Sequence, residues 1–164
     1  MDKIRWWVGI DKGVKIELTP NNEPVVLGEC NSSSAIFSST TISPSQNPSK
    51  LLIKHHSNNG DLVWVKVVEN VKDFKISISG NIYTWSSSFG FGFGATGYTF
   101  LFSKYYNDGA LIYTQRQGGN AIAMSFGTNN NFFFTGVFGG TVQMGSTTLT
   151  DVGGRDIFIS QWME

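Results

Sequence analysis

The fold is set by a stretch of sequence that runs Ile122-Ala123-Met124-Ser125-Phe126 and continues, after residues 127–131, into Phe132-Phe133-Phe134-Thr135-Gly136. The first run alternates with a period of two, which is typical of a β-strand with one buried face. The glycine and asparagines between the runs favour the positive φ values of a tight hairpin. The stretch therefore predicts two antiparallel strands joined by a short turn.

The same plan occurs twice more in the chain. Alternating runs at 14–18 and 74–78 lead through turns into strands predicted over 24–28 and 82–86. Each unit then closes on a third strand, predicted over 51–56, 100–105 and 157–162. A fourth, outer strand follows in the first two units, as Leu62-Val63-Trp64-Val65-Lys66 and Leu111-Ile112-Tyr113-Thr114-Gln115.

This outer strand has a third match near the start of the chain, Ile4-Arg5-Trp6-Trp7-Val8. The match makes Trp6, Trp64 and Tyr113 equivalent. We therefore predict three four-stranded antiparallel meanders in one all-β domain over residues 1–164. They cover about 11–70, 71–119 and 120–164, the last completed by an outer strand over residues 4–10.

A radial array of such meanders is a β-propeller. A sandwich and a barrel are the alternatives, but neither requires threefold internal repetition. Three blades are fewer than the usual four to eight. The repeat begins and ends in the chain at neighbouring positions, which predicts that a strand at one end completes a blade at the other.

The expected arrangement is a homodimer with six blades, in which each chain donates its outer strand to its partner. The residues of this interlock strand that we expect to pack are Ile4, Trp6, Val8 and Ile10. A fragment of a longer chain and a monomeric three-bladed form are the alternatives.

The third unit carries further motifs: Asp108-Gly109-Ala110-Leu111-Ile112-Tyr113, Gly118-Gly119-Asn120-Ala121-Ile122-Ala123-Met124, Asn131 to Thr141, and Gly154-Arg155-Asp156-Ile157-Phe158-Ile159-Ser160. Together they resemble the bacterial β-propeller repeat family often called SBBP, and the resemblance is strongest over residues 108–162. It implies propeller blades with structural and binding roles. It brings no catalytic residues.

The amino-acid composition argues against several kinds of ligand and site. Twelve basic and twelve acidic residues give no net charge, so we expect no binding to nucleic acid or to anionic membranes. One cysteine excludes a disulfide framework and a multi-thiolate zinc site. No apolar run is long enough to span a membrane and the start is unlike a signal peptide, so we expect a soluble, cytoplasmic protein.

The sequence offers little for catalysis. The run Gly90-Phe91-Gly92-Phe93-Gly94 lacks the lysine and helix of a phosphate-binding loop and is better read as a connection between strands. His55 and His56 are adjacent on a strand and point to opposite faces, so they cannot chelate one metal ion together. No serine-nucleophile motif is present, and Glu17 is the only acid that we place on an inner strand. We therefore predict no catalytic residues, no metal and no cofactor.

Four residues are candidates for ligand binding. Lys15 and Lys75 have equivalent places in the repeat and could hold an anion in a channel, or could lie along the blade faces with their amines in water. Tyr83 and Trp85 could stack on a sugar or base, or could fill the space between blades.

The function that these features favour is a non-enzymatic scaffold for structural or macromolecular interactions. The alternative is a lectin-like or other small-ligand-binding propeller, and an uncharacterised hydrolase comes third. The sequence does not identify the partner.

Overall fold

The computed structural model describes residues 4–5, 11–45, 48–68, 70–92, 95–128 and 131–163. Within these ranges the chain forms fourteen β-strands and no helix. It follows that the described chain contains no helix of the length and apolarity needed to cross a membrane.

The strands form four antiparallel sheets. Sheet 1 comprises β2 (Lys12–Leu18), β3 (Pro24–Cys30), β6 (Ser49–His55) and β7 (Leu62–Val68). Sheet 2 comprises β8 (Asp73–Ile76), β9 (Ile82–Gly92), β10 (Ala95–Tyr105) and β11 (Leu111–Gly118). Sheet 3 comprises β12 (Asn120–Phe126), β13 (Asn131–Met144) and β14 (Thr147–Met163). A small end sheet comprises β1 (Ile4–Arg5), β4 (Ala35–Phe37) and β5 (Thr40–Ile42).

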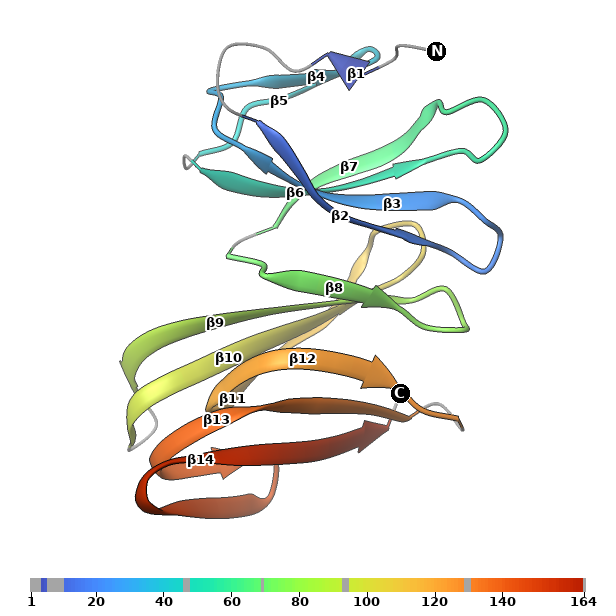
Figure 1. Cartoon of the computed structure of the whole chain (residues 1–164). Coiled ribbons are helices and arrows are strands. Elements are labelled where there is room, and N and C mark those ends of the chain that lie inside the picture. Colours follow the sequence, from blue (N-terminus) through green and yellow to red (C-terminus); the bar gives the residue numbers. More distant parts are fainter. Residues whose placement is uncertain are drawn as a thin grey trace.

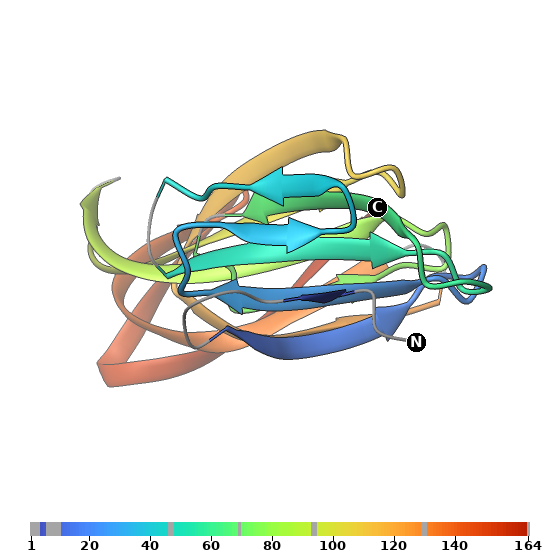
Figure 2. The same ribbon diagram turned by 90° about the horizontal axis from the view of Figure 1, so that it is seen from above.

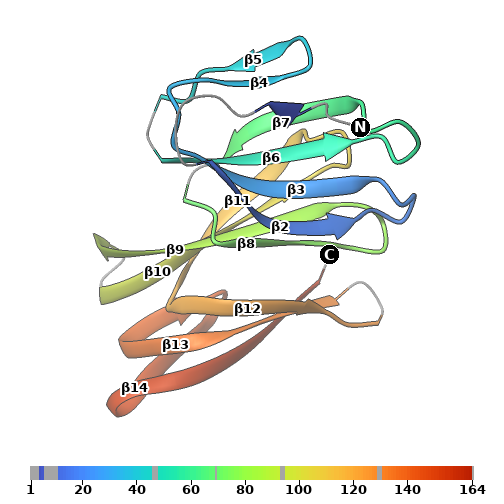
Figure 3. The same ribbon diagram turned by 45° about the horizontal axis from the view of Figure 1, so that its top comes forward.

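Sheets 1, 2 and 3 lie over one another in chain order (Figures 1 and 3). The end sheet covers the side of sheet 1 that faces away from sheet 2, and sheet 3 lies at the opposite end (Figure 1). Seen from above, the sheets overlap (Figure 2). The stack of one chain is therefore open, with sheets 1 and 3 at separate ends.

Each interface in this stack has its own apolar core. Leu27, Leu52 and Phe74 belong to the cluster between sheets 1 and 2. Trp85, Phe102, Phe132 and Phe134 belong to the larger, aromatic cluster between sheets 2 and 3. Cys30, Ala35, Phe37, Leu51 and Ile53 form a third cluster, between sheet 1 and the end sheet. Burial of these side chains is what holds the sheets together.

The three units repeat in register. The backbone N–H of Thr19, of Ser77 and of Gly127 each donates to the carbonyl of the residue four positions later, which closes the first hairpin of each sheet. The predicted equivalence of Trp64 and Tyr113 is confirmed, because they pair with Lys54 and Lys104 at the same step of their sheets. A register shift follows at once in both cases.

One predicted strand ends earlier than expected. The alternating run 74–78 suggested a strand through Ile78, but β8 ends at Ile76 because Ser77 already makes the hairpin-closing bond. Ile78 lies in the turn and is exposed. Counted from the turn, Lys75 is equivalent to Glu17, and Lys15 is equivalent to Asp73. The prediction that the two lysines are equivalent was therefore wrong.

The predicted interlock strand is described only in part. Ile4 and Arg5 pair with Phe37 and Ile36 of β4 in the same chain. Trp6, Val8 and Ile10 lie outside the described residues. Among the described strands, sheet 3 has three members, so the fourth strand predicted for it is not one of the described strands.

Candidate interaction surfaces

The two candidate lysines lie between the first strands of sheets 1 and 2. Lys15 Nζ is 3.1 Å from Glu17 Oε1 and 2.6 Å from Asp73 Oδ1, and Lys75 Nζ is 2.7 Å from Glu17 Oε1. Two cations thus face two carboxylates, and the cluster carries no excess charge. The hydrogen bond from Lys75 to Glu17 raises the pKa of the lysine.

The same cluster bonds directly to the backbone of β8. Lys15 Nζ donates to the carbonyl of Phe74 at 2.7 Å, and the N–H of Ile76 donates to Glu17 Oε2 at 3.0 Å. Side chains of one sheet thereby satisfy the exposed edge of the next, which an apolar contact could not do. Asp73 was not among the predicted residues, because the alternating run begins at Phe74 and β8 begins one residue earlier.

Tyr83 and Trp85 are both buried in the core between sheets 2 and 3. The ring of Tyr83 lies 5.3 Å from that of Phe126, edge to face, and the ring of Trp85 lies 5.9 Å from that of Phe134. Side chains packed in this way fill the space between sheets, which was the second of the two interpretations. They do not form an exposed stacking platform in the chain.

A second polar contact between sheets 1 and 2 was not predicted from the sequence. Lys54 is buried on β6, and its Nζ is 2.7 Å from Glu23 Oε2 and 2.7 Å from Asn107 Oδ1. Trp64 Nε1 donates to the carbonyl of Asn107 at 3.1 Å. The turn after β10 is thus fixed to the outer half of sheet 1. The hydrogen bond from Lys54 lowers the pKa of Glu23.

The two histidines have separate partners. Nδ1 of the buried His55 lies 2.9 Å from the carbonyl of Gly60, and Nδ1 of His56 lies 3.3 Å from Glu23 Oε1. Cys30 is buried, and desolvation raises the pKa of its thiol. Across the described ranges, no three His, Cys, Asp or Glu side chains are grouped as metal ligands would be.

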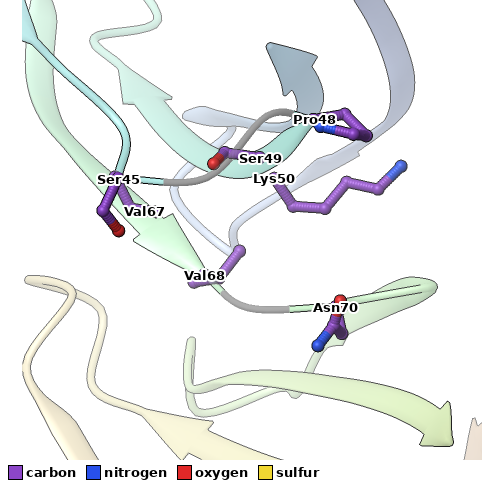
Figure 4. Close-up of a pocket in the computed structure, with 7 residues that line it drawn as sticks. All are labelled: Ser45, Pro48, Ser49, Lys50, Val67, Val68 and Asn70. Carbon is purple, nitrogen blue, oxygen red and sulfur yellow. The ribbon is translucent and has the colours of Figure 1, made fainter. Parts of the chain in front are cut away.

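A small pocket of about 120 Å³ lies where β6 begins and β7 ends, lined by Ser45, Ser49 and Val67 among others (Figure 4). Among the described residues that line it, Lys50 carries a charge; its side chain extends away from Ser45 (Figure 4) and pairs with Glu29 at 2.5 Å. The hydrogen bonds from Lys50 and Lys12 lower the pKa of Glu29 to about 2. The amine of Lys50 is therefore already paired with a carboxylate at this pocket.

The end faces of the stack are the most unusual surfaces. Counted from the hairpin turns, Leu52, Phe102 and Ile159 are equivalent, and their cross-strand partners are Leu27, Trp85 and Thr135. Leu52 and Phe102 are 1% exposed because the next sheet covers them, whereas Ile159 is 76% exposed. Ile157 and Met163 are also strongly exposed on sheet 3.

The end sheet covers part of the far face of sheet 1, but along β2 that face is open as sheet 3 is. Ile16 and Leu18 on β2 are 62% and 57% exposed. Their equivalents on β8, Phe74 and Ile76, pack in the core against sheet 1. Both ends of the stack thus present apolar side chains at positions that are packed inside it.

The third strand of sheet 3 also has an open edge. Within the described ranges β14 pairs with β13 alone, whereas β6 and β10 each pair on both sides. A groove of about 450 Å³ runs between the tip of the β13–β14 hairpin and residues 159–162. Neighbouring residues on a strand point to opposite faces, and consecutive residues line this groove. The groove therefore follows the edge of β14 and not one of its faces.

A polar rim is formed by tight turns along one side of the stack (Figure 1). The turns at 19–23, 77–81 and 127–131 are closed by backbone hydrogen bonds. Those at 56–61 and 106–110 are closed in the same way. Side chains reinforce some turns, as when Asp108 accepts the N–H of Ala110 at 2.8 Å.

Comparison with known proteins adds no family to this description. No protein-family model matches the chain, and a search of curated proteins found no match.

Proposed function

We propose that the chain is one half of a six-bladed β-propeller that closes with a second copy and acts as a non-enzymatic scaffold for macromolecular interactions. The observation that carries this proposal is the exposure of Ile159 at a position that is buried in sheets 1 and 2. An apolar face of this kind favours a further sheet packed on it.

A second copy suits both ends at once. Its sheet 1 presents Ile16 and Leu18, and the first chain's sheet 3 presents Ile157 and Ile159. These are the same two kinds of face that already pack within the chain. Placed about a twofold axis, two chains would cover both pairs of faces and close the ring, which leaves no end open.

The interaction function rests on the polar rim. Its turns are fixed by hydrogen bonds, so presenting them to a partner costs little conformational entropy. Ile78 at the rim is 86% exposed, although large apolar side chains more often avoid the solvent. We therefore propose the rim, with Ile78 on it, as the surface that contacts the partner.

Native mass spectrometry of the full chain tests the assembly. We expect twice the 18.1 kDa of one chain. Ile159→Asp or Ile16→Asp should give the single-chain mass, because each places a charge in the interface. Val152→Asp is the matched control, since Val152 is exposed on the β13–β14 hairpin and is not one of the residues named for either end face. A single-chain mass for the unsubstituted protein would overturn the proposal.

The rim is tested separately, with protein partners recovered from the source cell. Ile78→Asp should lose the partner while keeping the doubled mass, and Val152→Asp should keep both. Equal recovery with Ile78→Asp would show that the rim is not the binding surface.

A further inference from the structure

We infer that the open edge of β14 is a strand-addition site, and that its occupant is residues 4–10 of a second copy. This inference rests on the proposed two-copy assembly and specifies how the copies join. An unpaired strand edge presents a row of N–H and C=O groups that favours pairing with another chain.

The repeat identifies the strand that fits the site. In sheet 1 Trp64 pairs with Lys54, and the next pair joins Leu62 to His55, so Val63 is skipped. In sheet 2 Tyr113 pairs with Lys104, and the next pair joins Leu111 to Tyr105. In both sheets, therefore, the outer strand pairs an aromatic residue, and the leucine two positions before it, with consecutive residues of the third strand.

In sheet 3 the equivalents of Lys54 and His55 are Gln161 and Trp162. The sequence Ile4-Arg5-Trp6 repeats the pattern of apolar residue, skipped residue and aromatic residue. The inferred register therefore places Trp6 opposite Gln161 and Ile4 opposite Trp162.

The length of the connection to the next strand also supports residues 4–10 as an outer strand. β11, the outer strand of sheet 2, passes through Gly119 alone into β12 of the next sheet. Residues 4–10 are followed by Asp11 alone and then by β2. In chain order, therefore, residues 4–10 stand where the outer strand of a sheet preceding sheet 1 would stand.

The contacts of β1 also support its assignment as such an outer strand. β11 lies against the hairpin tip of the following sheet, where the N–H of Gly145 donates to Gln117 Oε1 at 2.8 Å. β1 pairs with β4. In the chain, β4 comes after the second strand of sheet 1, and the β13–β14 hairpin tip likewise comes after the second strand of sheet 3. β1 is also at the end of the stack farthest from sheet 3 (Figure 1).

The strand must come from another molecule because of distance. Sheet 2 lies between sheets 1 and 3 (Figures 1 and 3), and stacked sheets are about 10 Å apart. Residues 4–10 would have to cross roughly 20 Å to reach sheet 3 of their own chain. Asp11 alone separates them from β2, and one residue spans at most about 3.5 Å.

A disulfide between two differently substituted chains tests the register. One chain carries Trp6→Cys and the other Gln161→Cys, and the two are refolded together. Directly opposite residues have Cβ atoms close enough for a disulfide. We expect a crosslinked product of twice the chain mass on a non-reducing gel. The control pair, Trp7→Cys with Gln161→Cys, should not crosslink, because neighbouring side chains on a strand point to opposite faces.

A second pair, Val8→Cys with Ile159→Cys, keeps both Trp6 and Gln161 and should crosslink as well, which covers the possibility that the first pair fails to fold. If the unsubstituted chain has the doubled mass but neither pair crosslinks, the strand exchange is wrong and the two-copy assembly stands. A single-chain mass for the unsubstituted protein overturns the assembly, and the strand exchange with it.

Discussion

At the scale of single residues, the contacts between sheets 1 and 2 rest on charged groups in unusual places. Lys54 is buried and bonded to both Glu23 and Asn107. Removing one member of such a set leaves the others without their partner, which costs more than the net value of the bond itself.

We therefore expect Lys54→Met to lower the free energy of unfolding by roughly 1–3 kcal/mol, the usual cost of an unsatisfied buried group. Lys72→Met is the control, because Lys72 is exposed and bonds to Asn120 at the surface. It should change stability by less than about 0.5 kcal/mol. Urea denaturation of both variants measures the difference, and equal values would mean that Lys54 does not stabilise the contact.

Glu29 predicts a dependence on pH. Its pKa is lowered from 4.5 to about 2 by Lys50 and Lys12, so the folded state binds the proton less readily than the unfolded state. Its contribution to stability is complete above pH 4.5 and is lost as the pH falls towards 2. Glu29→Gln should flatten the fall in unfolding free energy over this interval, and Lys50→Gln should do so in part. An unchanged slope in Glu29→Gln would contradict the assignment.

At the scale of strands, the alternating runs predicted the first hairpin of each sheet, because a period of two is a local property of the sequence. The strands predicted over 82–86 and 132–136 run on to Gly92 and Met144, and the small end sheet was not predicted. The alternating runs could not place the end of β8, since Ile78 continues the apolar pattern and only the closing bond of Ser77 ends the strand. That error then gave Lys75 the wrong equivalent. The burial of Tyr83 and Trp85 depends on the next sheet, so the sequence left two interpretations open.

The first strands of sheets 1 and 3 both contain a β-bulge, and a glycine beside one of them gives a testable prediction. The register shifts after Gly13 in β2 and after Ala121 in β12. Close to the second bulge, a Cβ on Gly136 would lie 2.0 Å from the carbonyl oxygen of Asn120, whereas one on Gly13 would meet nothing within 4 Å. Gly136→Ala should therefore destabilise the protein by about 1–3 kcal/mol, as overpacking does. Gly13→Ala should have little effect, and thermal denaturation of the pair decides between them.

At the scale of the whole molecule, the repeat predicted an assembly that one chain does not complete. The sequence indicated the four-stranded units and the unmatched strand at residues 4–10, and the stack has unpaired apolar faces and an open edge in the places where the repeat would continue. One unit alone could not reveal this, because the exposure of Ile159 is unusual only in comparison with its buried equivalents in the other sheets, Leu52 and Phe102.

If two chains close the ring, folding and association are coupled, and stability depends on protein concentration. For a dimer that unfolds to two separate chains, each tenfold increase in concentration should raise the apparent free energy of unfolding by about 1.4 kcal/mol. Urea midpoints measured from low to high micromolar concentration should therefore rise for the unsubstituted chain and for Val152→Asp. Ile159→Asp, which places a carboxylate on the exposed face of sheet 3, should have a lower midpoint that no longer moves with concentration. A midpoint independent of concentration in the unsubstituted chain would mean that the apolar end faces do not pack against a second copy.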